Sequence, residues 1–237
     1  MAQSVVVKSG DSEMKIFEIR PEGKPRGAII VVQEAFGVTA HVKDIAERFA
    51  AAGFVAIAPH LFHRSGDPII PYDKMQMVMP HLMKLDAAAI ESDMKASLDY
   101  LETLGFSGRD VGVVGFCMGG TIAFFAGAKW PLGAAVSCYG GGIVQGRFGL
   151  APLNDLAAEL KTPWQGHYGD RDQSIPLTEV EVLRRKTAKG AVETEVHRYP
   201  DADHGFHCKD RSQFHAQSAA QSWERIVSFM KAHVGAK

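Results

Sequence analysis

Short apolar runs alternate with amphipathic runs of helical length along most of this chain, and this alternation limits the fold more than any other feature. Four apolar runs are almost unbroken, as in parallel strands covered on both faces: residues 27–33, 53–59, 110–116 and 133–139. Two runs are more polar and are expected near a sheet edge: residues 163–169 and 192–199. The predicted helices are residues 41–53, 86–105, 177–190 and 212–234. The pattern predicts an α/β protein with a mostly parallel central sheet and helices on both faces.

One segment, residues 66–86, departs from this alternation. Its prolines break any long helix, and its four methionines supply flexible apolar surface. Two interpretations stay open for it: a long connection packed on the body of the protein, or a cap over a ligand pocket. A β-hairpin from residues 4–9 and 14–20 is expected to open the chain. Because we find no repeat, low-complexity tract or linker, we expect residues 1–237 to form a single domain.

The composition argues against several classes of function. The formal net charge of −1 gives no reason to expect nucleic acid or an anionic membrane as a partner. No apolar run approaches the ~20 residues that span a bilayer, and the N-terminal segment does not resemble a secretory signal. The three cysteines include no CxxC pair, so we expect no disulfide framework and a reducing cytoplasm. Of these cysteines, Cys138 is expected to fill the core.

A second cysteine stands at an informative position, in the stretch VVGFCMGG at residues 113–120. Gly115, Cys117 and Gly119 form the nucleophile-elbow pattern G-x-S-x-G with cysteine in place of serine. The strained turn from strand to helix needs small neighbours, and it holds the thiol above the sheet at a helix N-terminus. There the helix dipole favours a thiolate, and the amide of Met118 points to where an oxyanion forms.

A nucleophile of this kind needs a base and a group that orients the base. In α/β-hydrolases the chain order is nucleophile, acid, histidine. After Cys117, Asp170 and Asp172 follow a predicted strand, and His204 lies in a loop after the last predicted strand. The order fits a catalytic triad, and from the residues alone either aspartate can be the acid.

Taken together, these motifs resemble the dienelactone hydrolase family, small α/β-hydrolases with a catalytic cysteine. The resemblance covers nearly the whole chain and is most specific in QEAFG at residues 33–37 and GFCMGG at residues 115–120. It implies an α/β-hydrolase fold and a triad of Cys117, Asp172 and His204. Asp172 is preferred because the family's acid precedes its proline at the spacing seen in DQSIP.

The resemblance also implies roles for the QEAFG segment. It implies that Glu34 contacts the nucleophile thiol and that the amide of Ala35 joins that of Met118 in an oxyanion hole. A thiolate beside a carboxylate is an unfavourable pair of like charges. We therefore hypothesise that resting Cys117 is a thiol hydrogen-bonded to Glu34, which takes the proton when substrate binds. Such an arrangement would protect the sulfur, because the thiolate is the oxidisable form.

The substrate-binding residues depart from the family's pattern. In the family, arginines hold the substrate carboxylate, and one stands four residues beyond the catalytic histidine. Here that position is Cys208, which we expect to be a bystander near the site, and Arg64 is the nearest candidate for a second arginine. Phe36 and Tyr139 are expected to line the pocket by their place in the motifs. We therefore expect a broader ester or lactone specificity.

The expected activity is hydrolysis of small-molecule carboxylic esters or lactones through a thioester acyl-enzyme, by a monomer or small homo-oligomer. No cofactor is expected. His60 and His63 suggest a metal pair, but no third ligand stands at a useful spacing, so no metal site is expected. Two alternatives stay open: a ligand-binding protein with an inactive triad, and a redox sensor that uses Cys117 as its reactive thiol.

Overall fold

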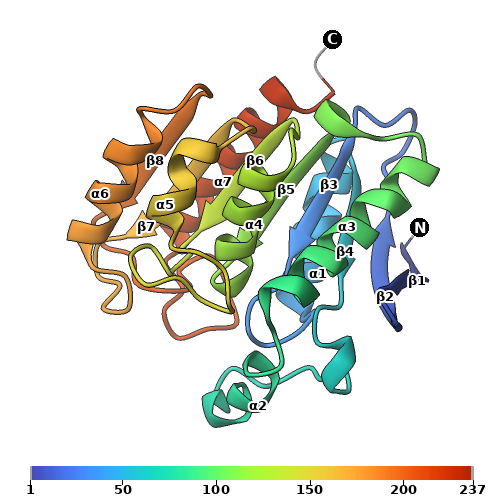
Figure 1. Ribbon diagram of the computed structural model, residues 1–237, viewed down its shortest axis with the longest axis horizontal. Helices are drawn as coiled ribbons and strands as arrows, with labels where there is room; N and C mark the ends of the chain where they lie inside the picture. The colour runs from blue at the N-terminus through green and yellow to red at the C-terminus, as the bar shows by residue number, and fades with distance from the viewer. Residues whose placement is uncertain (1, 236–237) are drawn as a thin grey trace.

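The computed structural model describes residues 2–235 and contains an eight-stranded sheet with the order β1-β2-β4-β3-β5-β6-β7-β8 (Figure 1). The strands are β1 Ala2–Ser9, β2 Ser12–Ile19, β3 Ala28–Val32, β4 Val55–Pro59, β5 Val111–Phe116, β6 Ala134–Cys138, β7 Trp164–Gly169 and β8 Thr194–Tyr199. All neighbouring pairs from β4 to β8 are parallel, and the β1–β2 hairpin joins β4 in antiparallel pairing. The sheet is therefore mostly parallel, as the sequence predicts.

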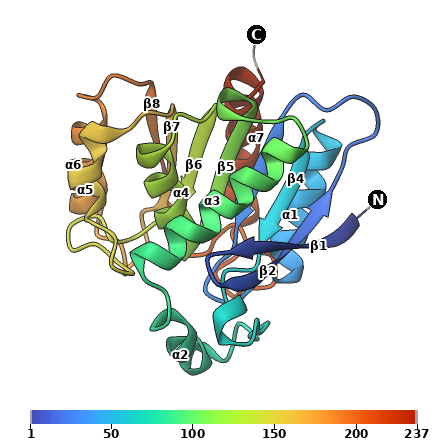
Figure 2. The ribbon, with the colours of Figure 1, turned by 45° about the vertical axis from the view of Figure 1, so that its right-hand side comes forward.

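Helices cover both faces of this sheet, which also confirms the prediction. They are α1 Ala40–Ala51, α2 Met79–Leu82, α3 Ala87–Thr103, α4 Met118–Lys129, α5 Leu153–Leu156, α6 Leu177–Thr187 and α7 Ala216–His233. Helices α1 and α7 lie behind the sheet and the others except α2 lie in front of it (Figures 1 and 2). Behind the sheet, the rings of Phe49 in α1 and Trp223 in α7 pack edge to face at 4.9 Å.

Burial along the strands explains their sequence patterns. Every residue of β3, β4, β5 and β6 is buried, as unbroken apolar runs require. The polar strand β8 lies at the sheet edge and is only half-buried, whereas β7 is fully buried despite its polar residues. Its histidine is satisfied within the sheet, because the ring nitrogens of His167 lie 2.8 Å from Gln165 Oε1 and 2.8 Å from Tyr199 Oη.

Several segments differ in detail from the sequence prediction: α5 was not predicted, and α6 ends at Thr187 rather than at residue 190. The C-terminal helix begins at Ala216, four residues later than predicted, because His215 caps it by accepting a hydrogen bond from the amide of Ser218. Residues 66–86 form a 3₁₀ turn at Met75–Met77 and the short helix α2, which project below the sheet in Figure 1. Among residues 2–235, no helix has the length and apolar character needed to cross a membrane.

The topology brings distant parts of the chain together at the carboxyl ends of the parallel strands. These strand ends lie side by side, so the segments that follow them lie close together. Glu34 follows β3, Cys117 follows β5, Asp172 follows β7 and His204 follows β8. The carboxyl ends of the parallel strands therefore form the candidate functional region of the sheet.

Candidate active site

Cys117 occupies a sharp turn between β5 and α4. Its backbone has φ of 54° and ψ of −115°, a conformation that is strained for a residue with a side chain. Backbone hydrogen bonds stabilise the turn. The amide of Cys117 donates to the carbonyl of Cys138 at 3.0 Å, and the amide of Gly120 donates to the carbonyl of Cys117 at 2.9 Å. Cys117 is thus the N-cap of α4, and the amide of Met118 is among those with no partner inside the helix.

Close backbone contacts explain the glycines beside this turn. A Cβ atom on Gly115 would lie 1.8 Å from the carbonyl oxygen of Gly119, and one on Gly119 would lie 2.4 Å from that of Val32. These neighbours are main-chain atoms that cannot turn aside. Glycine at both positions therefore lets β5, α4 and the end of β3 approach closely enough to form the elbow.

His204 and Asp172 are in contact at the carboxyl ends of the strands, near Cys117. Nδ1 of His204 lies 2.7 Å from Oδ2 of Asp172, and the ring lies on the buried side chain of Tyr139 with centroids 5.0 Å apart. The amide and hydroxyl of Ser174 donate to the other oxygen of Asp172 at 2.8 and 2.6 Å. Asp170 instead accepts hydrogen bonds from Arg198. The structure thus brings together His204 and Asp172, and not Asp170.

The surroundings of His204 favour its protonated form. Burial alone would lower the pKa of His204, but the charge of Cys117, the contact with Asp172 and a hydrogen bond to Cys117 outweigh it and raise the pKa to about 10. Burial would likewise raise the pKa of Asp172, yet the hydrogen bonds from His204 and Ser174 keep this pKa below its ordinary value. The protonated form of His204 beside the Asp172 carboxylate is therefore favoured at neutral pH.

These side chains open into a cavity of about 400 Å³, called here the Cys117 cavity. Its walls include Ala35, Phe36, Met75, Val78, Met79, Leu82, Cys117, Arg147, Asp172, His204 and Arg211. Four of these belong to residues 66–86, so this segment forms part of the cavity wall, which favours a cap over a connection that only packs on the body of the protein. Phe36 is also where the sequence predicts it, on the cavity wall.

Arg211 is a cavity residue that the sequence analysis missed. Its Nη1 donates to Oε1 of Glu34 at 3.3 Å, and its guanidinium lies over the rings of Phe36 and Tyr72 at 5.6 and 6.0 Å from their centroids. Only 9% of the side chain is exposed. Arg211 stands seven residues beyond His204, not four, and the loop before α7 returns it to the site. No spacing in the sequence pointed to it.

Glu34 is fully buried, but its contacts differ from those predicted. Its Oε1 accepts hydrogen bonds from Arg211 and, at 3.4 Å, from the hydroxyl of Tyr139, whereas Oε2 has no partner. The predicted hydrogen bond between Glu34 and the Cys117 thiol is therefore not present in this arrangement. The physical reason is that the buried carboxylate is compensated by the guanidinium of Arg211 instead.

Two predicted substrate-binding residues do not reach the Cys117 cavity. Arg64 is held elsewhere, because its Nη1 donates at 2.8 Å to Asp93, a fully buried carboxylate of α3 that needs a positive partner. Tyr139 is fully buried beneath His204 and absent from the cavity wall. Both predictions are corrected: Arg64 compensates a buried charge, and Tyr139 supports Glu34 and His204 from below.

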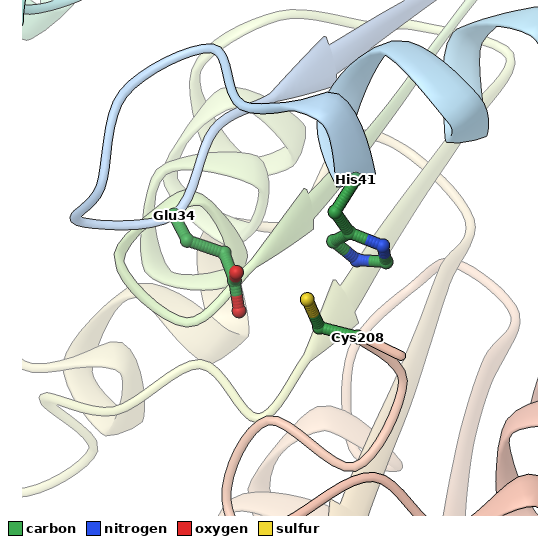
Figure 3. A group of neighbouring side chains, drawn as sticks. All are labelled: Glu34, His41 and Cys208. Atoms are coloured by element: carbon green, nitrogen blue, oxygen red, sulfur yellow. The ribbon is translucent and has the colours of Figure 1, made fainter. Parts of the chain in front are cut away.

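The other two cysteines are buried, and the two histidines that suggested a metal pair each have a carboxylate partner. Cys138 is fully buried in β6, as predicted for core filling, and Cys208 is fully buried beside Tyr72. His60 is paired with Asp67 at 2.8 Å and His63 with Asp93 at 3.0 Å. The two imidazoles are therefore bound to different carboxylates. Glu34, His41 and Cys208 lie near one another, with one ligand atom of each within 4.8 Å of those of the other two (Figure 3).

The sheet order, the elbow after β5 and the histidine after β8 define the class of this protein as an α/β-hydrolase. A model of the dienelactone hydrolase family matches residues 14–234, so the chain belongs to that family. It is 35% identical to an Escherichia coli K12 protein named "Putative carboxymethylenebutenolidase", over 98% of this chain and 87% of that one. It is 28% identical to a Pseudomonas putida carboxymethylenebutenolidase, over 89% of this chain and 87% of that one.

A solved structure gives the same result. The crystal structure named "Putative Dienelactone Hydrolase" from Klebsiella pneumoniae has a TM-score of 0.86 to this chain at 31% identity. The match covers 98% of this chain and 99% of that chain. The likeness therefore extends over the whole sheet and both helical layers.

Proposed function

We propose that this protein hydrolyses carboxylic esters or lactones, with Cys117 as the nucleophile, His204 as the general acid and base, and Asp172 as the group that orients His204. The observation that carries the proposal is a strained cysteine at a helix N-terminus, beside a histidine whose pKa is raised to about 10. Membership of the dienelactone hydrolase family supports it. A sulfur nucleophile displaces good leaving groups readily, which favours activated esters and enol lactones.

The proposed reaction has two halves. The sulfur of Cys117 bonds to the carbonyl carbon, the ester C–O bond breaks, and His204 gives its Nε2 proton to the leaving oxygen. The product of this half is a thioester acyl-enzyme. A water molecule then gives a proton to His204 and attacks the thioester carbon, and the C–S bond breaks to release the acid. Throughout, Asp172 fixes the ring through Nδ1.

The oxyanion formed in each half needs hydrogen-bond donors. The amide of Met118 begins α4 directly after the nucleophile, and Ala35 lies on the wall of the Cys117 cavity. We propose that these two amides receive the oxyanion, as the family resemblance implies. A single donor of this kind contributes about 3 kcal/mol to transition-state stabilisation, so small shifts of the loop after β3 should lower the rate.

Replacing Asp172 by asparagine should lower kcat for p-nitrophenyl acetate by about 10²- to 10⁴-fold, because the ring of His204 loses the carboxylate that selects its tautomer and supports its charge. The matched control is Asp170→Asn, which alters an aspartate two residues away that contacts Arg198 instead. The control should keep near wild-type turnover. A large loss in Asp170→Asn with little change in Asp172→Asn would contradict the assignment of the acid.

The charge of the cavity points to the kind of substrate. Arg211 and the exposed Arg147 line the Cys117 cavity, together with two carboxylates, Asp172 and Asp203. The apolar part of the wall comes from Phe36 and from methionines of residues 66–86. Arginine is well suited to bind a carboxylate with two parallel hydrogen bonds. We propose that Arg211 holds a carboxylate of the substrate, in place of the arginine that the family carries where this chain has Cys208.

This proposal is tested by comparing a neutral ester, p-nitrophenyl acetate, with an ester whose acyl group ends in a carboxylate, p-nitrophenyl hydrogen succinate. In Arg211→Gln the ratio of kcat/KM for the charged ester to that for the neutral ester should fall about 10- to 100-fold, because a charge-assisted hydrogen bond is lost. The same ratio in Arg211→Lys should lie between those of the wild type and Arg211→Gln. An unchanged ratio in Arg211→Gln would show that this arginine serves Glu34 alone.

The two alternative functions predict other results in the same assays. A ligand-binding protein would bind esters without turnover, and iodoacetamide would change nothing that is measured. A thiol redox sensor would form a disulfide or sulfenic acid with peroxide while it lacks esterase activity. The intact set of Cys117, His204 and Asp172 in contact favours hydrolysis over both.

A further inference from the structure

Two segments that border the Cys117 cavity are packed against each other. We call residues 66–86 the cap segment and residues 33–39, which connect β3 to α1, the β3 loop. Four buried residues, two from each segment, form a hydrophobic cluster that is separate from the core around the sheet: Ala35, Phe36, Ile70 and Val78. The cap segment is therefore attached to the body of the protein through the loop that also borders the nucleophile.

Main-chain contacts fix the distance between the two segments. The amide of Ile70 donates to the carbonyl of Phe36 at 3.0 Å. Gly37, with φ of 88°, comes so close to the cap segment that a Cβ atom on it would lie 2.2 Å from the carbonyl oxygen of Pro68. Because the two backbones touch, a shift of the cap segment at Ile70 is passed on to the β3 loop, with no flexible side chain between them to absorb it.

Tyr72 of the cap segment adds side-chain contacts to the β3 loop. Its ring packs edge to face on Phe36 with centroids 4.7 Å apart. Its hydroxyl lies 3.0 Å from Oγ1 of Thr39, the last residue of the loop before α1. The cap segment thus contacts the β3 loop both at its middle and at its end.

The β3 loop also belongs to the active site. Ala35 and Phe36 line the Cys117 cavity, and within residues 2–235 the amide of Ala35 donates to no other backbone group. In the proposed reaction this amide receives the oxyanion. Ile70, by contrast, is only 2% exposed and is not part of the cavity wall. An effect of Ile70 on catalysis therefore has to pass through the β3 loop.

We propose that Ile70 is a positioning residue, which holds the amide of Ala35 where the oxyanion forms by its hydrogen bond to Phe36 and its packing in the cluster. The inference rests on the proposed function and goes beyond it, because it makes the cap segment part of the catalytic geometry as well as of the cavity wall. Misplacing such a group by about 1 Å can lower a rate by about 10²-fold. It follows that hydrolysis requires the cap segment to be docked on the β3 loop.

The test compares two reactions of the same sulfur. Hydrolysis of p-nitrophenyl acetate forms an oxyanion. Alkylation by iodoacetamide forms none, because the Cys117 sulfur bonds to the methylene carbon as the carbon–iodine bond breaks and iodide leaves. In Ile70→Ala, kcat for the ester should fall about 10- to 100-fold with KM changed less than about threefold, since only transition-state stabilisation is lost. The rate constant for alkylation of Cys117, followed by mass spectrometry, should stay within about twofold of the wild-type value.

Ile69 provides the matched control. It is the same residue type one position earlier in the cap segment, but it is 61% exposed and belongs neither to the cluster nor to the cavity wall. Ile69→Ala should therefore keep the wild-type rate constants for both reactions. Ile70→Val, which keeps a branched side chain in the cluster, should recover most of the kcat that Ile70→Ala loses.

Three results would overturn the proposal: an unchanged kcat in Ile70→Ala, an equal loss of ester hydrolysis and alkylation in that variant, or a loss of the same size in Ile69→Ala. The second result would show a general disturbance of the elbow. If the wild type neither hydrolyses the ester nor is acetylated at Cys117, the proposed function fails and this inference fails with it. Should Ile70→Ala not fold, as judged by circular dichroism, an unchanged kcat in Ile70→Val overturns the proposal instead.

Discussion

Replacing Cys117 by alanine should lower kcat/KM for p-nitrophenyl acetate by at least about 10³-fold, because removal of a nucleophile leaves only the catalysis that binding and the oxyanion donors supply. The change takes away one sulfur atom at the end of β5 and leaves the backbone hydrogen bonds of the turn in place. Hydrolysis is followed by release of p-nitrophenolate. With the wild-type enzyme, mass spectrometry after rapid quenching should show one acetyl group on Cys117.

The control for this variant is a second cysteine in the adjacent strand. Cys138→Ala changes a fully buried thiol of β6 that does not line the Cys117 cavity, so turnover should stay near the wild-type value. Iodoacetamide should inactivate the wild type and Cys138→Ala alike, because the reactive sulfur is that of Cys117. Substantial hydrolysis by Cys117→Ala would overturn the nucleophile assignment and with it the thioester.

The same variant has a consequence for His204 that activity does not report. Burial lowers the pKa of His204, and the charge of Cys117 is the first of the opposing causes that raise it to about 10. In Cys117→Ala this pKa should fall toward the ordinary 6.5, which nitrogen NMR of the imidazole measures. Because the folded-state value is raised, the imidazolium stabilises the fold below pH 6.5 and this contribution is lost as pH rises through about 10.

The sequence predicted those features that depend on local pattern and chain order. Unbroken apolar runs marked β3 to β6, because strands covered on both faces have no polar side to alternate with. The glycines beside Cys117 marked the elbow, because a sharp turn leaves no room for side chains. Chain order placed Asp170, Asp172 and His204 at the same end of the sheet, and the family resemblance selected Asp172, which the structure finds in contact with His204.

Contacts between residues far apart in the chain, which depend on how the loops fold against the sheet, could not be predicted from the sequence. Arg64 looked free to bind substrate, because its partner Asp93 lies on α3, a helix packed beside it only in the folded chain. No sequence motif singled out Arg211, because its contact with Glu34 depends on how the loop before α7 folds back. The cluster of Glu34 with Cys208 depends on the same loop, so its convergence is visible only in three dimensions.

Replacing Gly115 by alanine should prevent the native fold or lower its free energy of unfolding by about 3 kcal/mol or more. The added Cβ would lie 1.8 Å from the carbonyl oxygen of Gly119 and 2.1 Å from its carbonyl carbon. Both atoms belong to the first turn of α4, so relief requires that the helix move away from β5. Urea denaturation followed by circular dichroism measures the loss.

The comparison variant is Gly190→Ala, in the loop after α6, where the nearest atom to an added Cβ is the carbonyl oxygen of Thr187 at 3.2 Å. Its effect should stay below about 1 kcal/mol, since φ is not positive there and the carbonyl of Thr187 has to shift by only a few tenths of an ångström. Because Gly115 lies under the nucleophile, any folded Gly115→Ala protein should also lose activity, as the displaced α4 carries the amide of Met118 with it. A Gly115→Ala protein with native stability and turnover would show that the elbow tolerates a side chain, and the steric reason given for these glycines would then be wrong.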